Sequence, residues 1–164
     1  MIIGVIGGAQ TTPEMLAQAD SVGRELAHRG CVLICGGLGG VMEAACRGAQ
    51  QAGGTTIGVL PGDDRHEANA YVTLPIVTGI GRARNVIVAL TSEALIAVDG
   101  GYGTLSELGF ALQFGRPVVG IGTWRFGNGA GEDASIVRCE DVVQAVDKAI
   151  ELARGAGTLA PRPL

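Results

Sequence analysis

The sequence predicts an α/β fold in which a parallel sheet is covered by helices on both faces. Short apolar runs alternate along the chain with stretches whose apolar residues repeat at helical spacing. Glycine clusters stand between several of these runs and the helical stretches that follow. Strands that are buried on both faces give continuous apolar runs, and helices connect such strands when they are parallel. The 164 residues therefore predict a doubly wound α/β domain.

The expected elements follow in a regular order. Strands are expected at residues 2–6, 31–35, 55–60, 71–77, 94–98 and 117–121. The fourth strand contains Pro75, which suits an edge of the sheet. The first expected helix begins at Pro13, after Thr12 as its N-cap, and ends at Gly30. A second follows the glycines at 36–40 and runs to about residue 52, and a third covers about 82–90. The fourth follows the glycines at 100–103, and the fifth covers residues 141–154. We expect a glycine-rich loop at 124–133.

These elements predict a single Rossmann-like domain over residues 1–154 that binds a nucleotide or another phosphorylated ligand, followed by a loose tail at 155–164. The formal net charge is −4 and the chain has no basic tract, which argues against nucleic acid or an anionic membrane as a partner. The apolar runs are too short to cross a bilayer, and residues 1–4 lack a charged signal-peptide start. We therefore predict a cytoplasmic protein.

The four cysteines predict buried, reduced thiols. Cys31 and Cys35 lie at opposite ends of one expected strand, about 13 Å apart at ~3.3 Å per residue, which is too far for a disulfide. Cys46 falls in a helical pattern and Cys139 near the C-terminus. The chain has no CxxC pair, and its two histidines are far apart in sequence. We predict no metal site.

Residues 98–107 (VDGGYGTLSE) are the most informative segment, because they connect an apolar strand to a helix through a glycine turn. The N-terminus of such a helix presents free N–H groups and the positive end of its dipole, which favour a phosphate group. Two other glycine clusters follow the first and second strands, and strand ends of this kind meet at one edge of the sheet. The candidate ligand-binding residues are Gly7, Gly8, Gly36, Gly37, Gly39, Gly100, Gly101, Tyr102, Gly103 and Thr104.

None of the glycine clusters matches a dinucleotide-binding fingerprint. Residues 37–40 do not fit G-x-G-x-x-G, and Gly58 and Leu60 stand where the acidic residue should be. Glu107 has two interpretations, because residues 104–107 (TLSE) match a helix capping box. It is either a cap or a functional carboxylate. Tyr102 could stack on a base or pack at a subunit contact, and the pattern does not decide between the two.

Three segments carry a resemblance to a known family. Residues 36–43 (GGLGGVME), 81–85 (GRARN) and 99–107 (DGGYGTLSE), in this order and spacing, resemble the Lonely Guy superfamily, which also contains molybdenum-cofactor carrier proteins. The resemblance covers about residues 1–122. The Lonely Guy enzymes are phosphoribohydrolases that release a free base from a nucleoside 5′-monophosphate with an arginine and a glutamate. The resemblance implies Arg84 and Glu107 for these catalytic roles.

Two residues depart from the enzyme pattern. Asp99 replaces the proline of the motif, and Asn85 replaces the lysine that usually follows the arginine. These departures resemble the cofactor-carrier branch more than the hydrolases. The superfamily was once labelled lysine decarboxylase-like, but pyridoxal phosphate chemistry needs a lysine for the Schiff base. The one lysine, Lys148, is far in sequence from every glycine turn, so we expect no pyridoxal phosphate and no covalent cofactor.

Three functions remain open from the sequence. The first is a carrier that binds a phosphorylated ligand such as molybdopterin, and the second is a phosphoribohydrolase that acts on a nucleoside monophosphate. The third is a structural or regulatory oligomer whose turns bind nothing in particular. Residues 108–114 are apolar on more than one side of the expected helix, which together with the resemblance predicts a homodimer or a higher homo-oligomer.

Overall fold

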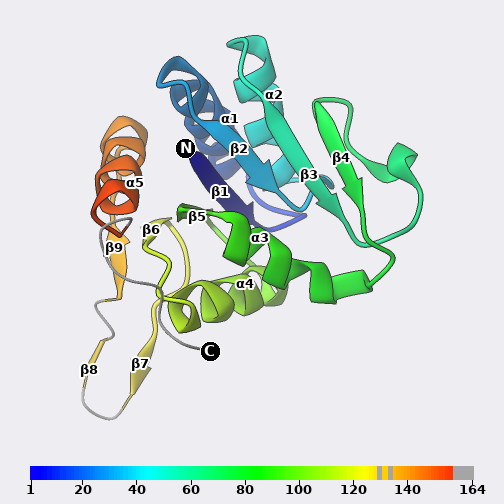
Figure 1. Ribbon diagram of the computed structural model, residues 1–164. Coiled ribbons are helices and arrows are strands. Elements are labelled where there is room, and N and C mark those ends of the chain that lie inside the picture. The colour runs from blue at the N-terminus through cyan, green and yellow to red at the C-terminus, as the bar shows by residue number, and fades with distance from the viewer. Residues whose placement is uncertain (129–130, 133–134, 157–164) are drawn as a thin grey trace.

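The computed structural model describes residues 1–128, 131–132 and 135–156, and it contains a seven-stranded parallel sheet (Figure 1). The strand order is β4-β3-β2-β1-β5-β6-β9, with every neighbouring pair parallel. Its strands are β1 (Ile2–Gly7), β2 (Val32–Cys35), β3 (Thr56–Leu60), β4 (Leu74–Val77), β5 (Ala94–Val98), β6 (Val118–Ile121) and β9 (Ile136–Arg138). The predicted fold class is confirmed.

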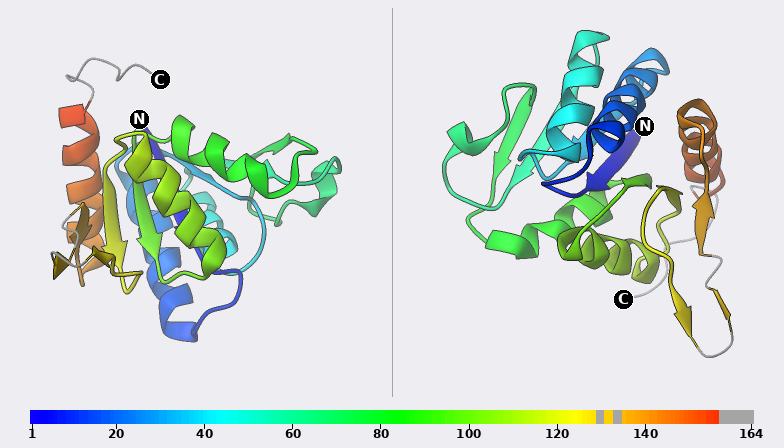
Figure 2. Two further views of the ribbon diagram at one scale, coloured as in Figure 1. Left: turned by 90° about the horizontal axis from the view of Figure 1, so that it is seen from below. Right: turned by 180° about the vertical axis from the view of Figure 1, so that it is seen from behind.

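Five α-helices cover the sheet on both faces (Figures 1 and 2). They are α1 (Pro13–His28), α2 (Val41–Gln51), α3 (Asn85–Thr91), α4 (Tyr102–Gln113) and α5 (Val142–Ala156). Buried residues of α1, α2 and α5 pack in one hydrophobic cluster, and those of α3 and α4 pack in another. β5 joins the two layers, because Ala94, Ile96 and Val98 belong to the first cluster, whereas Leu95 and Ala97 belong to the second.

The sheet reverses its direction of growth between β1 and β5. From β1 the chain adds β2, β3 and β4 on one side, and from β5 it adds β6 and β9 on the other. The register pairs Gly7 with Val98, so the carboxyl ends of β1 and β5 lie side by side. Doubly wound sheets bind their ligands at such a switch point. The fold therefore places the loops that follow β1 and β5 where a ligand site is expected.

The sequence predictions were wrong in several details of the sheet. The strand at 117–121 is not the last, because β9 pairs with β6 beyond it. β4 begins only at Leu74, and the predicted helix at 82–90 is divided into a 3-10 helix (Gly81–Arg84) and α3. The loop expected at 124–133 contains a short antiparallel pair, β7 (Gly127–Asn128) and β8 (Gly131–Glu132), and its residues 129–130 and 133 lie outside the described residues.

The start of α1 and the end of α5 can be compared with the predicted helix boundaries. The Thr12 N-cap is confirmed, since its hydroxyl accepts a hydrogen bond from the Met15 N–H at 3.3 Å and Pro13 opens α1. α5 continues to Ala156, so the first two residues of the predicted tail are helical, and 157–164 lie outside the described residues. No helix in the described part of the chain is long and apolar enough to span a membrane.

Candidate functional site

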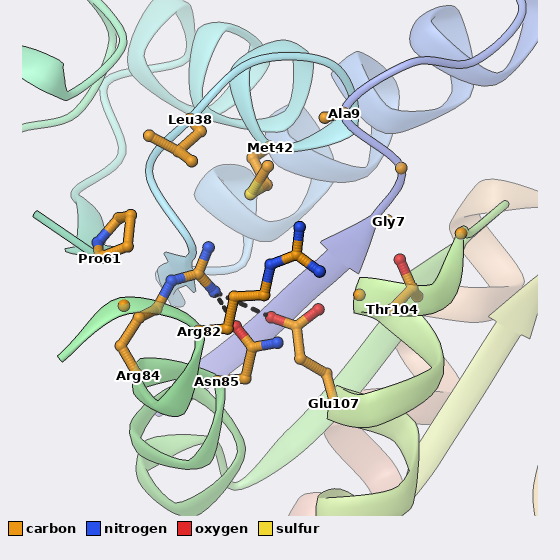
Figure 3. Close-up of a pocket in the computed structure, with 14 residues that line it drawn as sticks. Gly7, Ala9, Leu38, Met42, Pro61, Arg82, Arg84, Asn85, Thr104 and Glu107 are labelled. Atoms are coloured by element: carbon orange, nitrogen blue, oxygen red, sulfur yellow. Dashed lines mark hydrogen bonds and ion pairs between the residues drawn. The ribbon is translucent and has the colours of Figure 1, made fainter.

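A pocket of about 410 Å³ lies at the switch point of the sheet (Figure 3). Its walls come from the loop after β1, the turn before α2, the end of β3, the 3-10 helix before α3, and the start of α4. The residues that line it are Gly7, Gly8, Ala9, Leu38, Met42, Pro61, Gly81, Arg82, Arg84, Asn85, Gly101, Gly103, Thr104 and Glu107. The volume falls in the range of small-molecule sites.

The N-terminus of α4 forms one end of the pocket. Gly101 is the N-cap residue of this helix and has no side chain with which to cap it. Thr104 and Glu107 follow three residues apart, which places both on one side of the helix, and both are buried. The Thr104 hydroxyl has no hydrogen-bond partner among the residues that the structure describes. A buried hydroxyl without a partner is costly, so this atom is ready to bond to a ligand.

The capping-box interpretation of Glu107 is wrong. α4 begins at Tyr102, so Thr104 is the third residue of the helix and not its N-cap. Glu107 lies in the second turn, and its carboxylate accepts a hydrogen bond from Arg84 instead. The capping pattern failed because Gly101 starts the helix three residues earlier than a threonine N-cap would.

Arg84 and Glu107 form a buried ion pair beside the pocket, and Figure 3 shows both side chains pointing toward it. Nη1 of Arg84 lies 3.2 Å from Oε1 of Glu107, and the two residues are 7% and 6% exposed. Burial raises the pKa of the Glu107 carboxyl to about 7, against the opposing effect of the Arg84 charge. Near neutral pH this carboxyl is therefore divided between its two protonation states.

Only some of the glycines that were predicted to bind a ligand line the pocket. Gly7, Gly8, Gly101 and Gly103 line the pocket, as does Thr104. Gly36, Gly37, Gly39 and Gly100 do not line it. A Cβ on Gly36 would stand 2.2 Å from Nη2 of Arg84, so this glycine makes room for the arginine. A Cβ on Gly37 would meet Leu60 at 2.8 Å, and one on Gly100 would meet Thr104 at 2.8 Å. Gly36, Gly37 and Gly100 thus allow close packing around the site, whereas a Cβ on Gly39 would meet only Glu43, at 3.7 Å.

Tyr102 is 82% exposed and does not line the pocket. Its ring lies 6.0 Å from that of Trp124, at an interplanar angle of 36°. The Trp124 indole N–H donates to the Gly101 carbonyl at 3.3 Å, and Arg138 donates to the carbonyls of Thr123 and Trp124. Trp124 thus anchors its loop to the start of α4.

Several pocket residues carried no recognisable signal in the sequence. Leu38, Met42 and Pro61 form an apolar part of the wall, and apolar residues near a glycine turn are indistinguishable from core residues in sequence. Arg82 is exposed and also lines the pocket. Asn85 was noticed only as a departure from a motif. The signal that could have found it is its place in the segment 81–85, which already carried the family resemblance.

The cysteines are free and buried, as predicted. Cys35 and Cys46 are neighbours, with their sulfur atoms 3.5 Å apart, and no sequence pattern indicates this contact. The Gly37 N–H donates to the Cys35 sulfur at 3.3 Å. No group of three or more His, Cys, Asp or Glu residues that could hold a metal ion occurs in the ranges 1–128, 131–132 and 135–156.

Known proteins resemble this chain in both sequence and structure. It is 46% identical over 121 residues to a protein of Archaeoglobus fulgidus described as uncharacterized, covering 74% of this chain and 80% of that protein. It is 36% identical over 124 residues to the cytokinin riboside 5′-monophosphate phosphoribohydrolase of Mycobacterium tuberculosis, covering 70% of this chain and 66% of the relative. The second match thus spans just under two thirds of the enzyme.

Solved structures also match almost the whole chain. The molybdenum cofactor binding protein of Rippkaea orientalis has a TM-score of 0.81 and 36% identity, covering 96% of this chain and 97% of that one. The Moco carrier protein of Chlamydomonas reinhardtii has a TM-score of 0.82 and 40% identity, covering 94% and 98%. The model of the SLOG cluster4 family matches residues 1–151, and the chain therefore belongs to this family.

Proposed function

We propose that the protein binds a phosphorylated ligand of the molybdopterin or nucleotide type and holds it intact, as a carrier. The observation that supports this most directly is the buried Thr104 hydroxyl in the N-terminal turn of α4, for which the described residues offer no hydrogen-bond partner. Apart from chain neighbours and, for Gly103, the nearby backbone of α4 itself, no described atom lies within 4 Å of where a Cβ on Gly101 or Gly103 would stand. A phosphate can therefore approach the backbone N–H groups of this turn closely.

The opposite part of the pocket suits the rest of such a ligand. Leu38, Met42 and Pro61 offer apolar contact to a flat ring system. Arg82 and Arg84 supply positive charge between this wall and the α4 turn, and their side chains lie on the same side of the pocket as Glu107 in Figure 3. A few polar groups in a mainly apolar cavity are typical of a small-molecule site. We expect the phosphate at α4 and the ring toward Leu38.

Binding without cleavage fits the state of Glu107. Cleavage of an N-glycosidic bond develops positive charge on the ribose, which an ionised carboxylate must stabilise. Here burial raises the pKa of Glu107 to about 7, and Arg84 already occupies one of its oxygens. Both effects weaken the negative field that the carboxylate offers to the sugar. The similarity to the two molybdenum-cofactor proteins over nearly the whole chain also favours a carrier.

The experiment that tests the carrier proposal is incubation of the purified protein with molybdopterin and a panel of nucleoside 5′-monophosphates. After gel filtration, the ligand that co-elutes with the protein is identified by chromatography. We expect an intact phosphorylated ligand to co-elute with the wild type and less of it with Thr104→Val. Failure of every phosphorylated compound to co-elute would contradict the proposal and favour a structural role.

A second function, that of a phosphoribohydrolase, is favoured by the Arg84–Glu107 pair itself. A carboxyl with a pKa of about 7 can donate and accept protons near neutral pH, as acid–base catalysis requires. The same incubations test this candidate, since hydrolysis would release free base and ribose 5-phosphate. Base release that Glu107→Gln abolishes would establish the hydrolase and overturn the carrier proposal.

A further inference from the structure

A chain of hydrogen bonds connects the start of α4 to Arg84. The Ser106 hydroxyl donates to the Gly103 carbonyl at 2.7 Å and accepts from Nδ2 of Asn85 at 2.9 Å. On the other side of the same amide, Oδ1 of Asn85 accepts from Nη1 of Arg84 at 2.5 Å. That guanidinium nitrogen also donates to Glu107. The chain thus runs from the glycine turn to the buried ion pair.

Asn85 is held tightly in this chain. It is 6% exposed, and its amide donates on one side and accepts on the other, so its orientation is fixed by its two partners. Neither bond goes to the backbone of α3, although Asn85 is the first residue of that helix. The amide therefore does not cap its own helix but joins two side chains of different elements.

Arg84 has few hydrogen bonds besides the one to Asn85. Its guanidinium packs against Gly36, where a Cβ would collide with it, and Nε of Arg84 is buried without a hydrogen-bond partner in the described part of the chain. Nη1 has two acceptors, Asn85 and Glu107, of which Asn85 makes the shorter bond. An arginine side chain with few hydrogen bonds can adopt several rotamers, and each further hydrogen bond reduces their number.

We propose that Asn85 and Ser106 are positioning residues of the ligand site, which hold Arg84 toward Glu107 and tie its orientation to the α4 turn. This inference rests on the proposed function and deepens it. When the phosphate of a ligand lies on the α4 turn and its sugar or ring contacts Arg84, the ligand binds to two elements that are joined by the Asn85 and Ser106 hydrogen bonds. The neutral amide also serves this role better than a cationic side chain could, since a cation cannot accept a hydrogen bond from Arg84.

The decisive experiment follows the Glu107 carboxyl in the protein without ligand. Its pKa is measured by carbon-13 NMR in the wild type, Asn85→Ala and Ser106→Ala, with the signal assigned from its loss in Glu107→Gln. If Asn85 holds Arg84 in place, its removal lets the positive charge move away, and the pKa of Glu107 rises above the wild-type value. We expect a smaller rise in Ser106→Ala, which is the milder change. An unchanged pKa in both variants would overturn the inference.

A control serine lies at the C-terminal end of α3. The Ser92 hydroxyl donates to the Val88 carbonyl at 2.7 Å, as Ser106 does to Gly103, and neither serine lines the pocket. Ser106 also accepts from Asn85, whereas the partner of Ser92 is the Val88 carbonyl, so Ser92→Ala removes a serine-to-backbone bond outside the chain that leads to Arg84 and should leave the pKa of Glu107 unchanged. An equal shift in this control would show that the effect of Ser106→Ala is not local, and this too would overturn the inference.

Calorimetry with ribose 5-phosphate separates this inference from the proposed function. We expect Asn85→Ala to weaken binding about tenfold, the scale of one hydrogen bond to a charged group. Inorganic phosphate, which needs the turn but not Arg84, should lose less than about twofold. Equal losses for the two ligands would contradict a role through Arg84. Absence of all binding to the wild type would contradict the proposed function, while the NMR titration would still decide the role of Asn85.

Discussion

Two glycine-rich turns lie at the same edge of the sheet, one before α2 and one before α4. Both follow a buried strand, and both helices have a glycine as the N-cap residue. At α2 the protein itself fills the turn, because the Val41 N–H donates to the Gly8 carbonyl at 3.0 Å and Gly36 packs against Arg84. At α4 the space beside Gly101 and Gly103 is open, and the Thr104 hydroxyl has no hydrogen-bond partner among the described residues.

A glycine cluster at a strand end can therefore have two different structural roles. In the turn before α2, glycine lets other protein atoms approach the backbone closely, and in the turn before α4, glycine leaves space that a ligand can enter. The difference is visible in the surroundings of each Cα and not in the local sequence. We therefore expect substitutions in the first turn to affect stability and those in the second to affect binding.

The largest expected effect is on the α2 turn. Gly40 has a φ of +68°, and a Cβ there would lie 2.3 Å from the Gly8 carbonyl oxygen. Gly40→Ala should lower the free energy of unfolding by about 2–4 kcal/mol, measured by urea denaturation. Gly103→Ala is the control in the open turn, where a helical alanine should raise that free energy by up to about 1 kcal/mol. Similar losses in both variants would remove the distinction between the turns.

Thr104 provides the next largest effect. Thr104→Val should weaken binding of a phosphorylated ligand about tenfold, because it removes one hydrogen bond to a charged group. It should leave the free energy of unfolding unchanged or slightly higher, since the lost hydroxyl has no partner among the described residues. Calorimetry and urea denaturation measure the two quantities, with Thr104→Ser as the variant that keeps the hydroxyl. A clear loss of stability would mean that the hydroxyl has a structural partner.

The pH dependence of stability tests the environment of Glu107. Its pKa is raised to about 7 in the folded protein, from an ordinary value of 4.5. Between these values the folded state binds more protons than the unfolded state, so the contribution of Glu107 to stability falls as the pH rises toward 7. The unfolding free energy of the wild type, relative to Glu107→Gln, should therefore decrease from about pH 5 to about pH 7.5. A constant difference would contradict the raised pKa.

The smallest effect is expected at Tyr102, which lies in the open turn but outside the pocket lining. Tyr102→Ala should change the affinity for ribose 5-phosphate less than about twofold, because the backbone N–H groups of α4 remain. The fluorescence of Trp124, the one tryptophan of the chain, should respond to the loss of its neighbouring ring. A large loss of affinity would mean that the side chain of Tyr102, and not only the backbone of the turn, contacts the ligand.

The sequence was sufficient for the fold class, since continuous apolar strands separated by helical patterns identified the parallel sheet. Arg84 and Glu107 were singled out by the family resemblance and not by their local pattern, and in the structure both line the pocket and form an ion pair. β9 was missed because only Ile136 and Val137 mark it before Arg138. The role of Gly36 could not be predicted, since the guanidinium that it accommodates comes from a distant part of the chain.

Calorimetry with ribose 5-phosphate and with ribose tests whether the turn before α4 is a phosphate site. We expect heat of binding for ribose 5-phosphate, about tenfold weaker affinity in Thr104→Val, and no detectable binding of ribose. Equal binding of both sugars, or ribose 5-phosphate binding that Thr104→Val leaves unchanged, would contradict a phosphate site at this turn.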